Sequence, residues 1–158
     1  MKKLFFLLFL FTNFVFAFDK VSLEYGYKDN TDIYGIALQK DFDYKIFDMA
    51  KLAFDISAQS VNGKKDNLTI ISIQPLINID LSDNVYFEAG VGGSYFSKKY
   101  LDHKKFGIHF QFKESVGFGY RLNKDFDITL KYNHYSNADL DDNNAGLDFI
   151  GLKVAYRF

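Results

Sequence analysis

The last 33 residues, 126–158, alternate between apolar and polar side chains in two runs that flank a polar loop. In the first run one face is mainly apolar and the other polar: Phe126, Ile128, Leu130, Tyr132, His134 and Ser136 against Asp127, Thr129, Lys131, Asn133, Tyr135 and Asn137. In the second run Asp148, Ile150, Leu152, Val154, Tyr156 and Phe158 oppose Phe149, Gly151, Lys153, Ala155 and Arg157. Side chains repeat every second residue on a β-strand, so the pattern predicts a β-hairpin.

The same alternation occurs along the rest of the chain. Further strands are expected at residues 21–28, 33–40, 51–60, 68–80, 85–96 and 106–122, which with the hairpin makes eight. Apolar faces on so many strands of a short chain can turn toward lipid if the sheet closes on itself. The sequence therefore predicts an all-β protein, an eight-stranded antiparallel transmembrane β-barrel of the outer membrane. Bulges are expected at Pro75, which cannot donate to a ladder, and at Glu114, where a bulge would turn the carboxylate inward.

The first residues, 1–17, combine two lysines with a long apolar run and end in Val15 and Ala17 at the positions that a signal peptidase reads. They predict a secretory signal peptide, followed by a single domain at 18–158. Without Lys2 and Lys3, 17 basic and 20 acidic residues remain, which argues against nucleic acid as a partner. Cysteine is absent, which excludes disulfides and thiolate chemistry.

The polar face of each strand is expected to line a narrow interior. Glycines that resemble nucleotide loops, Gly90, Gly92, Gly117 and Gly119, fall on this face and are interpreted as small residues in a crowded lumen. Charges of both signs share the interior: Glu24, Asp55 and Glu88 with Arg121, Lys131, Lys153 and Arg157. This composition indicates a paired polar core and no wide pore.

His134, Ser136 and Asp148 lie on the apolar face, where polar side chains are costly. His134 and Ser136 are two residues apart, so their Cα atoms lie roughly 6.5–7 Å apart on one face of a strand. Asp148 opens the next antiparallel strand on that face. Ser136 is expected to act as nucleophile, His134 as general base and Asp148 as the acid that orients the imidazole. The loop acids Asp139, Asp141 and Asp142 are an alternative source of that carboxylate.

The sidedness of the site follows from the strand count. An exported barrel begins in the periplasm, so the strand from residue 126 rises and the loop 138–146 faces outside. The three residues then lie near the outer leaflet. The terminal aromatic residue, Phe158, is also typical of bacterial outer-membrane barrels.

The segment His134–Ala138 (HYSNA) followed by Asn144–Asp148 (NAGLD) resembles the signature of the lipid A 3-O-deacylases, the PagL family, which reads H-[YF]-S-N-A and then N-x-G-x-E. The run Phe110–Tyr120 resembles the family's sixth strand. The resemblance implies that His134 is the general base and Ser136 the nucleophile, with Asn137, Asn144 and Gly146 near the oxyanion. Asp148 stands where the family usually has Glu.

The resemblance implies an esterase that releases a 3-hydroxyacyl chain from lipid A of lipopolysaccharide in the outer membrane of a Gram-negative bacterium. It implies no cofactor and no metal; a homodimer is a possible assembly. The alternatives are a passive small barrel that binds surfaces or partners, and a phospholipid esterase or acyltransferase. His103, in the outer loop, and His109, expected on the interior face of the strand 106–122, are interpreted as structural because neither has metal-ligand spacing.

Overall fold

The computed structural model describes residues 17–46 and 49–158. Eight long strands form its wall: β1 Lys20–Lys28, β2 Thr31–Ile46, β3 Ala50–Asn62, β4 Asn67–Asp80, β5 Val85–Phe96, β8 Phe110–Arg121, β9 Phe126–Ser136 and β10 Leu147–Arg157. Two short strands, β6 (Tyr100–Leu101) and β7 (Lys104–Lys105), form a separate hairpin. The predicted signal peptide lies outside the described residues except for Ala17.

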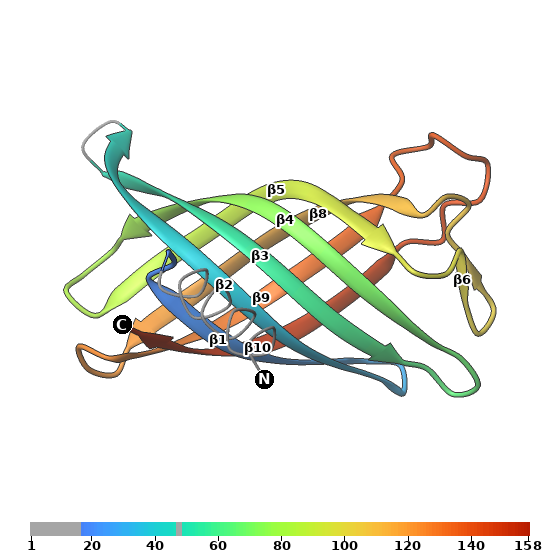
Figure 1. Ribbon diagram of the computed structural model, residues 1–158, viewed down its shortest axis with the longest axis horizontal. Coiled ribbons are helices and arrows are strands. Elements are labelled where there is room, and N and C mark those ends of the chain that lie inside the picture. The colour runs from blue at the N-terminus through green and yellow to red at the C-terminus, as the bar shows by residue number, and fades with distance from the viewer. Residues whose placement is uncertain (1–16, 47–48) are drawn as a thin grey trace, which may run out of the picture.

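The eight long strands close into an antiparallel barrel in the order β1-β10-β9-β8-β5-β4-β3-β2 (Figure 1). Closure is made by β1 and β10, which pair continuously from Lys20 opposite Arg157 to Tyr27 opposite Ile150. The predicted all-β, eight-stranded antiparallel barrel is therefore confirmed. Within residues 17–46 and 49–158, no helix is long and apolar enough to cross a membrane.

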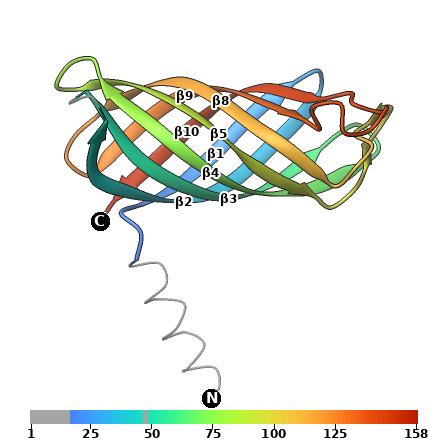
Figure 2. The ribbon, with the colours of Figure 1, turned by 90° about the horizontal axis from the view of Figure 1, so that it is seen from above.

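The two ends of the barrel differ. Four-residue connections, 81–84 and 122–125, lie at the end that holds the C-terminus. The opposite end carries the connection from β5 to β8, with its β6–β7 hairpin, and the loop 137–146 between β9 and β10 (Figures 1 and 2). We call this second end the mouth.

Side chains alternate between the outer and inner surfaces as the sequence predicts. Large apolar side chains are exposed on the outer surface of every barrel strand except β3: Leu23, Ile36, Ile71, Ile73, Val91, Phe118, Leu130 and Leu152 are examples. On β3 the outward Leu52, Phe54 and Ile56 are partly exposed. Exposed apolar side chains in a continuous belt fit contact with hydrocarbon and would be a liability in water.

The interior of the barrel is filled by paired charges. Lys131 Nζ lies 2.7 Å from Glu88 Oε1, and Lys153 Nζ lies 3.8 Å from Glu88 Oε2 and 3.7 Å from Asp55 Oδ2. Lys153 also donates a 3.0 Å hydrogen bond to Gln39. All of these side chains are buried, so the paired polar core is confirmed for Asp55, Glu88, Lys131 and Lys153. Arg121, also expected inside, instead pairs with Asp80 at the exposed rim.

Near the mouth the interior becomes apolar. Ten buried residues form one cluster there: Ile33, Val61, Leu68, Ile70, Phe96, Leu101, Phe106, Tyr135, Leu147 and Phe149. Leu101 from the β6–β7 hairpin and Phe106 cover this cluster, since both are almost fully buried. The lumen is thus packed from its middle toward the mouth, with charges in the middle and aromatic rings toward the mouth.

The glycines on the inner face make room for neighbouring side chains. A Cβ atom at Gly119 would lie 2.0 Å from the ring of Tyr86, and one at Gly117 would lie 2.5 Å from the carbonyl oxygen of Leu130. A side chain at either position would collide with the packed interior. The interpretation of these glycines as small residues in a crowded lumen is confirmed.

Three details of the strand prediction are wrong. β2 runs to Ile46, past the expected end at Lys40, and its register with β3 shifts between Asp41 and Lys45. The strand expected from Phe106 begins at Phe110, because Gly107 has a φ of 74° and Phe106 turns into the core.

Pro75 makes no bulge: β4 and β5 keep one register on both sides of it, with Ile73 opposite Gly93 and Leu76 opposite Gly90. An outward-facing proline omits its N–H without displacing the chain.

The charged interior yields a stability prediction. Lys153→Met leaves Asp55 and Glu88 short of a buried cation, so the free energy of unfolding should fall by about 3–5 kcal/mol. Lys51→Met is the matched control: Lys51 pairs with Asp80 at the barrel rim and is half exposed, so its loss should cost at most about 1 kcal/mol. Denaturant titration of the detergent-folded barrel measures both, and equal effects would contradict the paired-core interpretation.

Candidate active site

Tyr135 fixes the end of β9 that carries the site. Its side chain is fully buried, its ring stacks on Phe149 at a centroid distance of 6.1 Å, and its hydroxyl donates a 2.9 Å hydrogen bond to Gln59. Because neighbouring side chains on a strand point to opposite faces, an inward Tyr135 turns both His134 and Ser136 outward. The buried ring thereby sets the direction of both polar side chains.

His134 and Asp148 face each other across the β9–β10 pair. The imidazole Nδ1 lies 2.6 Å from Asp148 Oδ1. A carboxylate only accepts hydrogen bonds, so Nδ1 carries the proton and Nε2 of the neutral ring is left as an acceptor. The two residues that the sequence expects to meet are brought together by the register.

Two further residues hold Asp148, and neither was predicted from the sequence. Tyr132 donates its hydroxyl proton to Asp148 Oδ1 at 2.8 Å, and Lys28 Nζ lies 3.5 Å from Oδ2. Tyr132 lies two residues before His134 on the outward face of β9, so the alternation of the strand could have indicated it as a neighbour of the site. Lys28 comes from β1, which borders β10 only because the barrel closes.

Ser136 ends β9 and is half-buried, opposite Phe112 of β8. In the part of the chain that the structure describes, no hydrogen bond joins its hydroxyl to His134. The two side chains leave the same face at strand spacing, so a change of rotamer suffices to bring them together. Apo hydrolases often hold such contacts long until substrate binds.

The three residues expected near the oxyanion lie in the loop after Ser136. Asn137 is fully buried: its Nδ2 donates to the carbonyl oxygens of Phe106 and Asn143, and its backbone N–H donates to Asn144 Oδ1. Asn144 Nδ2 donates to Asp139 at the surface. Gly146 has a φ of 63°, and a Cβ there would lie 3.7 Å from His134 Cε1, which places this glycine beside the imidazole.

Two of the three loop acids, Asp139 and Asp141, are engaged within the loop, and Asp142 is exposed. Asp139 accepts from Asn144, and Asp141 accepts from the backbone N–H and side chain of Asn143. These hydrogen bonds from Asn143 lower the pKa of the Asp141 carboxyl. Among the described residues, Asp148 is the carboxylate that contacts His134.

Glu114 does not turn inward. β8 keeps an unbroken register with β9, and Glu114 stands on the outer surface directly opposite His134. Its neighbour on the other side is Val91 of β5. The expected bulge is wrong because the charge of a single residue does not outweigh the register of a continuous ladder. His134 is therefore flanked by a carboxylate-bearing residue on each neighbouring strand.

The remaining histidines lie away from the site. His103 is exposed in the β6–β7 turn. His109 precedes β8 and is stacked on Tyr95, whose ring is exposed on the outer surface, so the expectation of an interior position is wrong. Within the described ranges, no group of three or more metal-ligating side chains is close enough to hold an ion.

The geometry combines a hydroxyl, an imidazole and a carboxylate on the apolar outer surface near the mouth of a small barrel. These are the side-chain types that nucleophilic catalysis on an ester requires. The fold and the site define a class: small outer-membrane β-barrels that carry a hydrolase-like cluster on the lipid-facing surface.

A family model described as "Lipid A 3-O-deacylase (PagL)" matches residues 32–157. The chain therefore belongs to the lipid A 3-O-deacylase (PagL) family. The match includes both β9 and β10 and so contains His134, Ser136 and Asp148.

Individual relatives agree with the family. The chain is 36% identical over 84 residues to "Lipid A deacylase PagL" of Bordetella bronchiseptica, a match that covers 53% of this chain and 47%, about half, of that protein. The crystal structure of the outer membrane enzyme PagL superposes with a TM-score of 0.76 at 22% identity, covering 88% of this chain and 99% of the other. The Yersinia pestis outer membrane protein Ail superposes with a TM-score of 0.56 at 13% identity over 89% of this chain and 99% of its own.

The loop contacts of Asn137 yield a second prediction. Asn137→Ala removes the hydrogen bonds from Nδ2 to the carbonyl oxygens of Phe106 and Asn143; the Phe106 oxygen keeps its bonds from Ile108 N–H and Gln111 Nε2, so the expected cost is about 1 kcal/mol. We expect the loop 138–146 to become a faster site of proteolysis in the folded barrel. Asn143→Ala is the control, because its side chain donates only to Asp141 at the surface. Cleavage rates that are equal in the two variants would contradict the anchoring role.

Proposed function

We propose that this protein is a serine esterase that hydrolyses the ester-linked 3-hydroxyacyl chain at the 3-position of lipid A. The observation that carries the proposal is the 2.6 Å contact between His134 and Asp148 on the outer surface, with Ser136 two residues further along β9. Family membership supports the substrate class. An apolar outer surface next to the cluster suits a substrate whose acyl chains lie in the membrane.

In the proposed mechanism Ser136 Oγ attacks the ester carbonyl carbon. His134 takes the hydroxyl proton on Nε2, while Asp148 accepts the Nδ1–H and stabilises the imidazolium. Collapse of the tetrahedral intermediate breaks the bond to the sugar oxygen, which receives the proton from His134. A water molecule activated by His134 then hydrolyses the acyl-enzyme and frees the 3-hydroxy fatty acid.

We propose that the oxyanion of the tetrahedral intermediate forms next to Asn144 and Gly146. Asn144 Nδ2 donates only to exposed Asp139, so this donor can exchange its partner at little cost. Asn137, also expected near the oxyanion, has a fully buried amide with two carbonyl partners and is better suited to holding the loop in place. Gly146 leaves space beside the imidazole for the reacting ester.

The site is proposed to work at the outer leaflet of the outer membrane of a Gram-negative bacterium. Ser136 lies at the end of β9 next to the loop 137–146, and the C-terminus lies at the other end of the barrel (Figure 1). With the termini in the periplasm, the mouth faces the cell exterior, where lipid A is found.

The nucleophile is tested by Ser136→Ala. Detergent-folded wild type incubated with lipopolysaccharide should release 3-hydroxy fatty acid, and the mass of lipid A should fall by one hydroxyacyl group. Ser136→Ala should fold normally and lose at least about 10³-fold in turnover, because the members of such a cluster act as a unit.

Other outcomes select the rival functions. An unchanged lipid A mass with wild type would favour a passive barrel, and a gain of an acyl chain would favour a transferase. Near-normal turnover by Ser136→Ala, with turnover lost in His134→Ala, would replace the acyl-enzyme by direct attack of a His-activated water.

The acid is tested by two substitutions of Asp148. Asp148→Asn should lower turnover by roughly 10³-fold, since the amide no longer stabilises the imidazolium or the required tautomer. Asp148→Glu restores the residue usual in the family and should keep substantial activity. Asp141→Asn is the control, and a stronger loss there than in Asp148→Asn would refute the assignment.

A further inference from the structure

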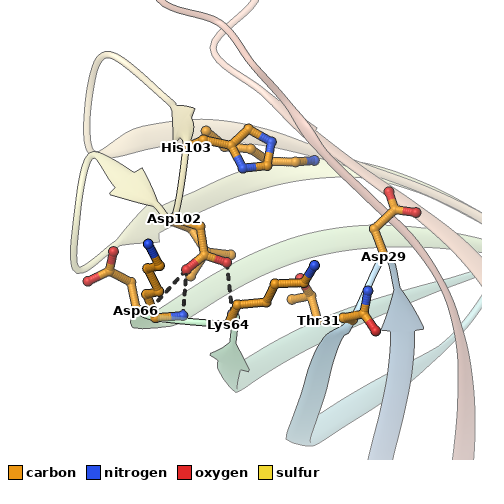
Figure 3. A pocket seen from close by; sticks show the side chains of 10 residues that line it. Asp29, Thr31, Lys64, Asp66, Asp102 and His103 are labelled. Carbon is orange, nitrogen blue, oxygen red and sulfur yellow. Dashed lines mark hydrogen bonds between the residues drawn. The ribbon is translucent and has the colours of Figure 1, made fainter.

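A cavity of about 600 Å³ opens in the mouth of the barrel, apart from the outward-facing cluster (Figure 3). Three connections line it: the β1–β2 turn at residues 29–31, the β3–β4 turn at residues 64–66 and the β6–β7 hairpin at residues 101–104. Its volume lies within the range of small-molecule sites.

Asp102 builds one wall of this mouth cavity. It accepts hydrogen bonds from the backbone N–H groups of Lys64 at 2.8 Å, Lys65 at 2.8 Å and Asp66 at 3.0 Å. These donors, Lys65 and Lys64 foremost, lower the pKa of the Asp102 carboxyl, so it stays ionised. The hairpin thereby fixes the turn that carries two adjacent lysines, as the dashed lines in Figure 3 show.

The lysine ammonium groups of the cavity are not matched by carboxylates. In the described part of the chain, no carboxylate lies within 4.0 Å of Nζ of Lys64, Lys65 or Lys104. Of the cavity's acids, Asp102 is occupied by backbone donors and Asp66 lies 3.9 Å from Lys98. Asp29 is the remaining carboxylate, across the cavity from Asp66 (Figure 3). The formal charges of the three lysines and the three aspartates balance, but the three ammonium groups have no carboxylate partner within 4.0 Å among the described residues, so their N–H donors can bind the oxygens of an anionic ligand.

The cavity is connected to the candidate active site through Lys104. Its Nζ lies 3.5 Å from the carbonyl oxygen of Gly146, and Gly146 adjoins the imidazole of His134. On the same side, Lys28 at the end of β1 contacts Asp148, and the β1–β2 turn that follows lines the cavity. A ligand can therefore reach over the rim of β1 and β10 from one site to the other.

We propose that the mouth cavity binds a phosphate group of the glycolipid substrate while Ser136 attacks its acyl ester. This inference rests on the proposed function. The acyl chains must lie along the apolar wall, so the phosphorylated sugar headgroup lies above the rim, beside the cavity. Phosphate oxygens accept several charge-assisted hydrogen bonds at once, and Lys64, Lys65 and Lys104 supply the donors. Anchoring the headgroup holds the ester at the site and lowers KM.

The test compares phosphorylated lipid A with lipid A from which the phosphates have been removed. Lys64→Gln/Lys65→Gln should weaken binding of the phosphorylated lipid by roughly tenfold or more and leave the dephosphorylated lipid unaffected. The control is Lys45→Gln/Lys124→Gln, which removes two exposed lysines at the other end of the barrel. Affinities are measured in detergent in a Ser136→Ala background, so the result does not depend on turnover.

Kinetics with Ser136 intact give the second readout. The Lys64→Gln/Lys65→Gln protein should show a raised KM for phosphorylated lipid A with kcat nearly unchanged. Equal losses for both lipids, or an equal loss in the control variant, would overturn the proposal in favour of general electrostatic attraction. Inorganic phosphate that binds wild type as tightly as the glycolipid would make the cavity a free-anion site and equally overturn it. Lysine-dependent binding without any ester hydrolysis would contradict the proposed function alone.

Discussion

The pairing of β1 with β10 is the interaction on which the rest of the structure depends. An open sheet in hydrocarbon would leave the N–H and C=O groups of two edge strands without partners, at several kcal/mol each. Closure removes these edges and leaves each side chain of the wall with two environments, lumen or outer surface. Charges such as Glu88, Lys131 and Lys153 must then pair inside, and the outer surface must be apolar. Closure also places Lys28 of β1 against Asp148 of β10.

The candidate active site depends on the same division between the lumen and the outer surface. Tyr135 packs inward among aromatic rings, so the adjacent His134 and Ser136 face outward. The partner of His134 must come from a neighbouring strand at the same level, and Asp148 of β10 fulfils this condition. A reactive cluster on the outside of a barrel needs no pocket in the middle of the lumen, which is filled by paired charges.

The mouth joins this surface to the loops. Asn137 ties the loop after β9 to Phe106, and Phe106 packs in the same aromatic cluster as Tyr135. Lys104 reaches from the β6–β7 hairpin to Gly146. The connections proposed to bind a lipid headgroup are thereby held on one end of the barrel, above the apolar wall proposed to face acyl chains. This division matches the two parts of a glycolipid.

The sequence by itself determined the eight strands of the barrel, the face of most of their side chains and the candidate cluster, because the period of two is a local property and because His134 and Ser136 lie on one strand. The tertiary structure decided whatever depends on register or on a special backbone angle. Gly107, at a φ of 74°, delays the start of β8, and an unbroken ladder keeps Pro75 in register and Glu114 opposite His134. The partners of Asp148 from other strands and the mouth cavity likewise arise only when distant turns meet, which local alternation does not encode.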